Sequence, residues 1–347
     1  MRTSRAASAV LAAAAVWAVA AAAEAPPAID PAQARLDQTV NGLDGPGLAA
    51  ACSADGGLLV VGCEKGSLQY WRKDVLMGVR VGDTAPRTIP AHNGPILSVA
   101  ACGDLFASCG ADGKVLVWNL ADEKAVQTLD AGAVVRALAA TADGKLLAGA
   151  GDDGAVHLWE PVAGKPGPKL SGATDWLLAV AISPDGKAVA AAGYDGRLRI
   201  WDVGSGKVQI DVAAQPPAPP NAPPAAANIV TALAFNPDGK SIAVGGADGV
   251  IHLFQTADGK FVRSMPGHTS AVAALAFHPG GALLASAGKD RTVRLWNPAA
   301  GQAIKTLEGH GAWVQAVVFT GQGARLASVG ADASLRLWDL SDPTKKQ

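Results

Sequence analysis

Apolar residues in this chain recur in short runs, either uninterrupted or alternating with polar residues, and Gly, Pro, Asn and Asp separate the runs. In the segment 266–307, four such runs end at Phe277, Ser286, Trp296 and Leu307. Each run has the length of a β-strand, and each break has the composition of a turn. The pattern therefore predicts a four-stranded antiparallel sheet. Because one such sheet leaves both faces without cover, several copies must pack face to face.

A short phrase within this unit recurs seven times along the chain. Most copies start at an Asp-Gly turn, and all continue as an alternating strand that ends in Trp or Phe. The copies occupy residues 65–71, 112–118, 153–159, 195–201, 248–254, 290–296 and 332–338. Their terminal aromatic residues are separated by 47, 41, 42, 53, 42 and 42 residues. A period near 42 residues is typical of a repeat architecture, so we expect seven sheets in one closed domain.

Two dipeptides within the repeats carry a family resemblance. Gly-His occurs at residues 267–268 and 309–310, and Trp-Asp occurs at residues 201–202 and 338–339. With these dipeptides and their common register, the units resemble WD40 repeats over about residues 35–340. The resemblance implies an all-β fold, namely a single seven-bladed β-propeller with four-stranded antiparallel blades.

The segment before the first repeat resembles a strand from the end of a repeat. Residues 38–42 match residues 305–309, whereas only nine residues follow Trp338. We therefore expect the segment 35–40 to supply the missing outer strand of the last blade. This arrangement removes the open sheet edge that would otherwise invite aggregation.

The resemblance also implies a structural tetrad of His, Ser, Asp and Trp, joined by hydrogen bonds within a blade. Three blades contain all four residue types, namely His92, Ser108, Asp112 and Trp118; His268, Ser286, Asp290 and Trp296; and His310, Ser328, Asp332 and Trp338. The other four blades lack the His and the Ser, and we expect them to depend more on apolar packing. No catalytic residues are expected, because a hydrolytic triad needs one exposed nucleophile beside an oxyanion hole.

Partner-binding candidates come from the rim of the face that is called the top in WD40 proteins, where partners commonly bind. Three positions per blade point there: three and five residues after the His position, and one before the turn Asp. The candidates are Trp176, Tyr194, Trp313, Arg136 and Lys289. Trp, Tyr and Arg contribute much of the binding energy at protein interfaces. The alternative is that these rings cap the blade edges and bind nothing.

The remaining histidines do not suggest a metal site, and no cofactor is expected. His157 and His252 lie two residues before the closing aromatic residue, where other blades have Arg199, Arg294 and Arg336. We expect this column to lie on an exposed strand face.

The first 23 residues differ from the rest of the chain. Arg2 and Arg5 precede an uncharged apolar run at 6–22 that ends in small residues. This pattern is typical of a secretory signal peptide, and a membrane anchor of this length and composition would be short and weakly apolar. We expect a signal peptide at 1–23, a linker at 24–34, the propeller at 35–340 and a tail at 341–347. The protein would then be periplasmic or secreted, without a stable membrane span after cleavage.

Two inserts interrupt the repeat, at about residues 76–84 and 213–225. The second is rich in Pro, which makes a segment extended and semi-rigid. It is either a tolerated loop expansion or an arm that docks a partner.

Four cysteines remain open to two interpretations. Cys52, Cys63, Cys102 and Cys109 allow three complete disulfide pairings, and the sequence does not choose among them. Buried thiols are the simpler alternative.

The charge balance does not suggest binding to nucleic acid. The chain has 29 basic and 30 acidic residues and a formal net charge of −1, so it has no footprint for nucleic acid. We expect a monomeric, non-catalytic scaffold that binds a protein or peptide on its top face. The alternatives are a ligand-binding or enzymatic propeller that uses the central channel, and an accessory to an envelope redox or cytochrome system. Fold alone does not decide among these functions.

Overall fold

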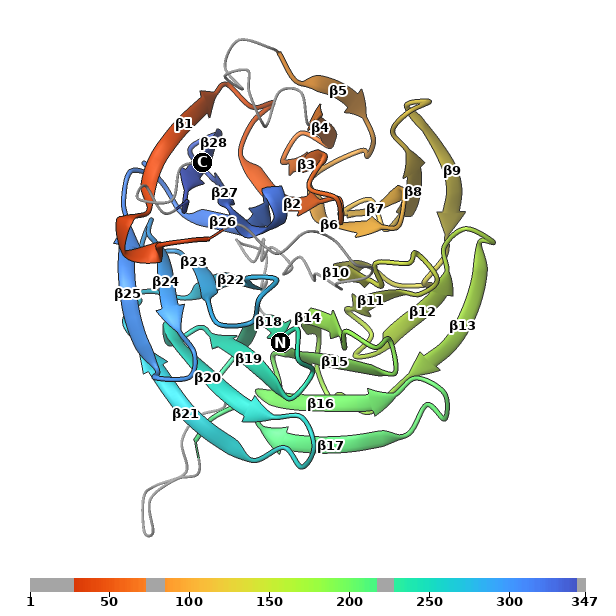
Figure 1. Cartoon of the computed structure of the whole chain (residues 1–347). Helices are drawn as coiled ribbons and strands as arrows, with labels where there is room; N and C mark the ends of the chain where they lie inside the picture. The colour runs from red at the N-terminus through yellow and green to blue at the C-terminus, as the bar shows by residue number, and fades with distance from the viewer. Residues whose placement is uncertain (1–27, 73–84, 217–227, 342–347) are drawn as a thin grey trace, which may run out of the picture.

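The computed structural model describes residues 28–72, 85–216 and 228–341, and in this part of the chain seven four-stranded antiparallel sheets form a ring (Figure 1). In each blade the first strand lies nearest the central axis and the fourth lies at the perimeter. The predicted all-β, seven-bladed propeller is confirmed.

The strands follow the chain outward within each blade. Blade 1 contains β2 (Gly47–Cys52), β3 (Leu58–Cys63), β4 (Ser67–Arg72) and β5 (Arg87–Pro90), and blade 2 contains β6 (Ile96–Cys102), β7 (Leu105–Gly110), β8 (Val115–Asn119) and β9 (Lys124–Leu129). Blade 3 contains β10 (Val135–Ala140), β11 (Leu147–Gly151), β12 (Val156–Glu160) and β13 (Lys165–Leu170), and blade 4 contains β14 (Leu177–Ile182), β15 (Ala188–Gly193), β16 (Arg197–Asp202) and β17 (Val208–Ala213). Blade 5 contains β18 (Val230–Phe235), β19 (Ser241–Gly246), β20 (Val250–Gln255) and β21 (Phe261–Pro266), and blade 6 contains β22 (Val272–Phe277), β23 (Leu284–Gly288), β24 (Val293–Asn297) and β25 (Gln302–Leu307).

Blade 7 joins the two ends of the chain. It contains β26 (Val314–Thr320), β27 (Arg325–Gly330), β28 (Ser334–Asp339) and the N-terminal strand β1 (Arg35–Asn41), with the short helices η1 (Pro31–Gln33) before β1 and η3 (Gly321–Gly323) between β26 and β27. Strand β1 pairs antiparallel with β28, and in Figure 1 the red end of the chain lies against the blue end. The predicted closure by an N-terminal strand is confirmed, and its reason is that β28 would otherwise be an unpaired edge.

The core lies between neighbouring blades. All six residues of β14, β18 and β22 are buried, because the first strands are covered on both faces. The closing aromatic residues are buried as well; Trp201 of blade 4 belongs to one apolar cluster with Val156 and Leu158 of blade 3. Each blade is therefore held by contacts with the next one around the ring.

The turn between the second and third strands explains the Asp-Gly pairs of the repeat. The residue after the turn position has a positive φ in every blade: Gly66, Gly113, Gly154, Gly196, Gly249, Arg291 and Ala333. Glycine adopts this conformation without steric cost, whereas Arg291 and Ala333 do so with strain.

All four cysteines are buried and free, which favours the interpretation as buried thiols. Burial raises the pKa of Cys52 and Cys102 to about 12 and that of Cys63 to about 11. Because the thiolate is the reactive form, these thiols are expected to be inert at neutral pH.

Several predicted features lie outside the described residues. The signal peptide at 1–23, the first insert at 76–84, most of the second insert and residues 342–347 are among them. Within the described part of the chain, no helix has the length and apolar character needed to traverse a bilayer.

Closure by β1 can be tested with two substitutions on the same strand. Val40 is 9% exposed and packs in the core cluster between blades 7 and 1, whereas Leu36 is 44% exposed. We expect Val40→Ala to lower the free energy of unfolding by about 1–2 kcal/mol, since burying a valine contributes about that much. Leu36→Ala serves as the control and should change it by less than about 0.5 kcal/mol. Chemical denaturation measures both, and equal effects would contradict this role of β1.

Candidate functional site: the top rim of the propeller

The tetrad residues of blade 2 are joined in one hydrogen-bonded chain. His92 Nδ1 lies 2.9 Å from Asp112 Oδ1, and His92 Nε2 lies 2.8 Å from Ser108 Oγ. Trp118 Nε1 donates to Ser108 Oγ at 2.8 Å. Because the indole N–H only donates, the Ser108 hydroxyl accepts from Trp118 and can donate its own O–H to His92 Nε2, so that the ring proton sits on Nδ1 and faces Asp112. Every polar group of this buried set therefore has a partner.

Blades 6 and 7 repeat this arrangement. The His–Ser distances are 2.6 Å for His268–Ser286 and 2.8 Å for His310–Ser328, and Trp296 and Trp338 donate to their serines at 2.8 and 2.9 Å. The ring nitrogens Nδ1 of the two histidines contact Asp290 and Asp332. One such set lies in each of blades 2, 6 and 7, and its histidine and serine are buried, which fits an internal brace.

In blades 2 and 7 the tetrad pairs a neutral imidazole with an ionised carboxylate. Burial lowers the pKa of His92 and His310. Burial alone would raise the pKa of Asp112, but hydrogen bonds from His92 and from two backbone N–H groups outweigh it and lower the pKa. The charge states that the hydrogen bonds of this brace require are therefore the ones these groups have at neutral pH.

The expected exposure of the column two residues before the closing aromatic residue is wrong. Arg199, His157 and His252 are 2, 8 and 3% exposed, and Arg294 and Arg336 are partly buried. In blades 3 and 4, which lack a tetrad, this column contacts the turn aspartate. Arg199 Nη1 lies 2.6 Å from Asp195 Oδ2, and His157 Nε2 lies 3.0 Å from Asp153 Oδ2. The sequence signal for these contacts is the spacing of four residues between the turn aspartate and the basic residue.

A backbone hydrogen bond gathers the rim positions at the top of each blade. The residue before the turn aspartate donates its N–H to the carbonyl three residues after the His position. Tyr194 donates to Trp176 at 3.0 Å, Lys289 to Ala271 at 2.9 Å, and Ala331 to Trp313 at 2.8 Å. The two kinds of rim position therefore lie next to each other within a blade.

Four side chains of blades 3 and 4 form the first rim cluster. Arg136 and Asp152 of blade 3 form a two-armed ion pair, with Arg136 Nη2 at 2.8 Å from Asp152 Oδ2. The guanidinium carbon of Arg136 lies 4.7 Å from the ring centre of Trp176 in blade 4. Tyr194 meets Trp176 edge-on, with ring centres 5.8 Å apart. The cluster spans the junction of two blades and leaves Trp176 39% exposed.

A second rim cluster joins blades 6 and 7. Lys289 Nζ lies 4.8 Å from the ring centre of Trp313, which is 44% exposed. Burial lowers the pKa of Lys289. The structure therefore groups the five candidate residues into two cation–aromatic clusters, and Asp152 joins them as the residue that orients Arg136.

Comparison with known proteins shows the family. A model described as WD domain, G-beta repeat matches residues 84–119, 123–160, 164–202, 259–297 and 301–339. The chain belongs to the WD40 repeat family. A second model, Anaphase-promoting complex subunit 4 WD40 domain, matches residues 220–271.

Curated relatives match this WD40 chain over short stretches. Proteins named Small ribosomal subunit protein RACK1 are 45% identical over 53 residues in Glycine max, 35% over 75 residues in Medicago sativa and 37% over 75 residues in Brassica napus. These stretches cover 15, 21 and 21% of this chain and 16, 23 and 23% of the relatives. The matched region therefore spans less than a quarter of each relative's length.

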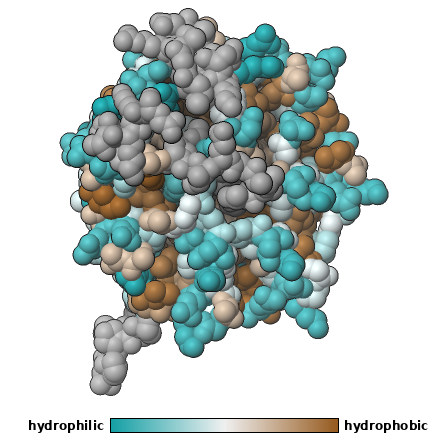
Figure 2. Space-filling view, viewed as in Figure 1, coloured by the Kyte–Doolittle hydropathy of each residue, from teal (hydrophilic) through white to brown (hydrophobic). Residues whose placement is uncertain are grey.

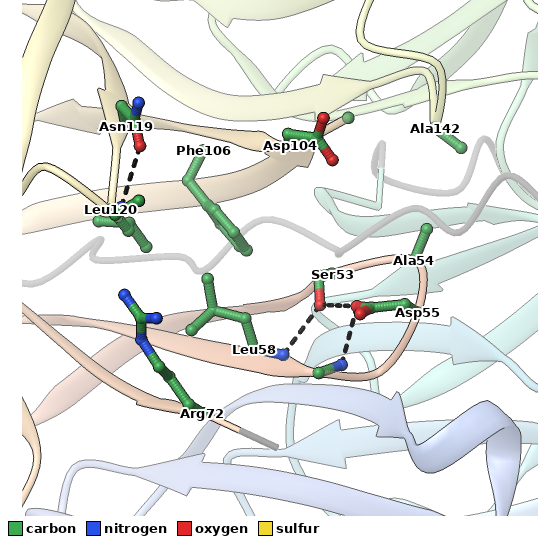
Figure 3. A pocket seen from close by; sticks show the side chains of 13 residues that line it. Ser53, Ala54, Asp55, Leu58, Arg72, Asp104, Phe106, Asn119, Leu120 and Ala142 are labelled. Carbon is green, nitrogen blue, oxygen red and sulfur yellow. Dashed lines mark hydrogen bonds between the residues drawn. The ribbon is translucent and has the colours of Figure 1, made fainter. Parts of the chain in front are cut away.

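The face of this WD40 propeller that Figure 2 shows has polar residues interspersed with small apolar areas, apart from the part that grey atoms cover. An open cavity of about 610 Å³ lies between blades 1 and 2 (Figure 3). Three of its polar side chains serve local turns: Ser53 Oγ donates to Asp55 and accepts from Leu58 N, and Asn119 accepts from Ala121 N. Within the described residues, no group of three or more His, Cys, Asp or Glu side chains could hold a metal ion.

The tetrad makes a stability prediction. Ser286→Ala removes the acceptor of Trp296 Nε1 and the partner of His268 Nε2, so two buried polar groups lose their hydrogen bonds. We expect a loss of about 1–3 kcal/mol in the free energy of unfolding, measured by chemical denaturation. Ser205→Ala, on an exposed turn, is the control and should change it by no more than about 1 kcal/mol. A loss for Ser286→Ala no larger than that control would contradict the bracing role.

The buried histidines predict acid sensitivity. Burial lowers the pKa of His92, His252, His278 and His310 below the ordinary 6.5. The unfolded chain then binds more protons than the folded chain once the pH falls below 6.5, so the free energy of unfolding must decrease there. The pKa values of Asp112 and Asp332 are lowered from 3.8, so the free energy of unfolding should decrease a second time once the pH falls below 3.8. Denaturation at successive pH values measures both steps, and constant stability from pH 7 to pH 5 would contradict the first.

Proposed function

We propose that this protein is an exported, non-catalytic interaction scaffold that binds a protein or peptide partner on the top rim of its propeller. WD40 propellers typically serve as protein-interaction scaffolds, so the family supports the general function. The observation that carries the specific proposal is the pair of cation–aromatic clusters at Arg136–Trp176 and Lys289–Trp313.

Both exposed tryptophans of the described residues belong to these clusters. The other exposed large apolar side chains are aliphatic and lie on outer strands or in a turn away from the rim: Leu36, Val126, Val162, Val208, Val262 and Ile304. The rings are held by neighbouring groups, so a partner that covers them loses little side-chain entropy. Preorganised aromatic anchors of this kind dominate binding energy at interfaces.

The charge at the second cluster indicates the chemistry of the partner. Within the described part of the chain, no carboxylate forms an ion pair with Lys289, whereas Arg136 is paired with Asp152. A carboxylate on the partner would therefore find an uncompensated cation beside an aromatic face at Trp313. We propose a partner segment that presents an apolar side chain and an acidic group.

The ribosomal role in the names of the RACK1 relatives is not part of the proposal. The matched stretches cover at most 21% of this chain, and a net charge of −1 does not favour RNA. Export is proposed because Arg2 and Arg5 precede an apolar run that ends in small residues, the order found in signal peptides.

The proposal is tested by partner recovery from the cell envelope. We expect Trp176→Ala and Trp313→Ala each to weaken partner binding by about 2 kcal/mol, which is roughly a thirtyfold loss of affinity. Affinity purification followed by mass spectrometry finds the partner, and titration with the purified partner gives the affinities. Val162→Ala and Val126→Ala remove exposed apolar groups elsewhere and should leave binding unchanged. Equal recovery with the tryptophan variants and the wild type would rule out the top rim as the binding surface.

A further inference from the structure

The turn aspartate has a nitrogen partner on a side chain in nearly every blade that contains one. In blades 2, 6 and 7 the partner is the tetrad histidine, and in blade 4 it is the guanidinium of Arg199. In blade 3 there are two partners: His157 Nε2 at 3.0 Å and Lys169 Nζ at 2.8 Å, both on Asp153 Oδ2. Imidazole, guanidinium and ammonium groups thus all serve as the partner of the turn aspartate.

Blade 5 has the aspartate but lacks the contact. Asp248 Oδ2 lies 3.9 Å from His252 Nε2, which is too far for a hydrogen bond. His252 is only 3% exposed, and its Nε2 atom is buried without a partner. The buried Nδ2 atom of Asn228 likewise has none among the described residues. Buried polar atoms without partners are rare in folded proteins and call for an explanation.

The residues that carry these atoms line a cavity. It has a volume of about 630 Å³ and is formed by the top of β20 and β21 together with Gln215, Pro216 and Asn228. Pro216, Val250 and Pro266 supply apolar walls, and Asp248 supplies the charge. No lysine or arginine lines the cavity, and the sequence between Pro216 and Asn228 contains no basic residue. The described part of blade 5 therefore offers a negatively charged cavity with aliphatic sides.

The difference from blade 3 shows what is missing. In blade 3 the outer strand places Lys169 opposite His157, and in blade 5 it places Ser264 opposite His252. The two blades share the His and the Asp at the same spacing, and they differ in the ammonium group. Ser264 instead contacts His252 Nδ1 at 2.9 Å, which leaves Nε2 on the side of Asp248.

The protonation state suits a donor ligand. Burial lowers the pKa of His252, so the ring is neutral at pH 7. When Nδ1 donates to Ser264 Oγ, Nε2 presents a lone pair beside the Asp248 carboxylate. Two acceptors then face the same space, and a group with several N–H donors and a positive charge would satisfy both.

We propose that this cavity binds the side-chain ammonium group of a lysine from a partner protein, which takes the place that Lys169 fills in blade 3. The ammonium would donate to Asp248 and to His252 Nε2, and the lysine methylenes would lie against Val250 and the two prolines. The inference extends the proposed scaffold function to a second contact. It does not depend on the rim tryptophans, which are in other blades.

The test measures peptide binding by NMR. A peptide with one lysine, acetyl-Gly-Lys-Gly-amide, is titrated into the purified protein, and the ring nitrogen shifts of His252 are followed. The expected result is saturable binding in the millimolar range with a selective shift of Nε2, because one partly exposed ion pair contributes little free energy. The same peptide with norleucine in place of lysine should bind at least about tenfold more weakly.

Three variants separate the proposal from a general structural effect. Asp248→Asn should lose the binding, whereas the matched change in blade 3, Asp153→Asn, should keep it. Ser264→Lys would supply an internal ammonium group as in blade 3 and should lower the affinity for the peptide about tenfold or more. Ser264→Met is the uncharged control. The rim variant Trp313→Ala should bind the peptide normally, so a failure here is distinguishable from a failure of the rim proposal.

Several results would overturn the inference. These are equal binding of the lysine and norleucine peptides, undiminished binding by Asp248→Asn, or undiminished binding by Ser264→Lys. Binding of n-butylamine as tight as that of the peptide would assign the cavity to a free amine rather than to a partner's lysine.

Discussion

In blades 2 to 7, the top of the blade is organised by a carboxylate at the turn between the second and third strands. One oxygen of Asp332 accepts the N–H of Ser334 two residues on, and the other accepts the N–H of Gly311 from the loop that enters the blade. The same two contacts recur at Asp112 and Asp290. The turn and the entering loop are thereby tied together. Because the rim residues lie in these two segments, their positions follow from this interaction.

The carboxylates of Asp112, Asp195 and Asp290 are largely buried and need a donor or a cation, since an unpaired buried charge is costly. The repeats meet this need with different residues. Histidine does so in the tetrads, Arg199 in blade 4, and Lys169 with His157 in blade 3. The scaffold tolerates these exchanges because each residue supplies N–H donors to the carboxylate of the turn aspartate. Blade 5 departs from the rule, and the departure coincides with a cavity, which is why we assign it a ligand rather than a structural defect.

The rim clusters show how a repeated scaffold presents unrepeated chemistry. Trp176 and Trp313 occupy the same position of two blades, and each is approached by a cation from the preceding blade, Arg136 or Lys289. The ring of blades brings together residues that are 40 and 24 positions apart in the sequence. Among the described residues, only Arg136 of the two cations has an ion-pair partner, which is Asp152. The two clusters are therefore similar in shape and different in charge. This difference can set the orientation in which a partner segment binds across them.

The fold could be predicted almost completely from the sequence, because a period near 42 residues and alternating strands leave few other ways to cover the sheet faces. The tetrads were also accessible, since their four residue types recur at constant spacing. The burial of Arg199, His157 and His252 was not predicted. Their strand has an outer neighbour, and burial depends on whether that strand and the entering loop cover the side chain, as at Ser264 and Lys169.

By itself, the sequence determined the number of blades, the strand order and the closure by β1, because hydrophobic period and turn chemistry are local properties of the chain. The tertiary structure alone decided which side chains meet across blades, such as Arg136 with Trp176. It also decided that the cysteines are buried and free, and that the described residues of blade 5 line a cavity beside Asp248. Contacts between residues of different repeats depend on the twist and spacing of neighbouring sheets, and these emerge only when the ring is closed.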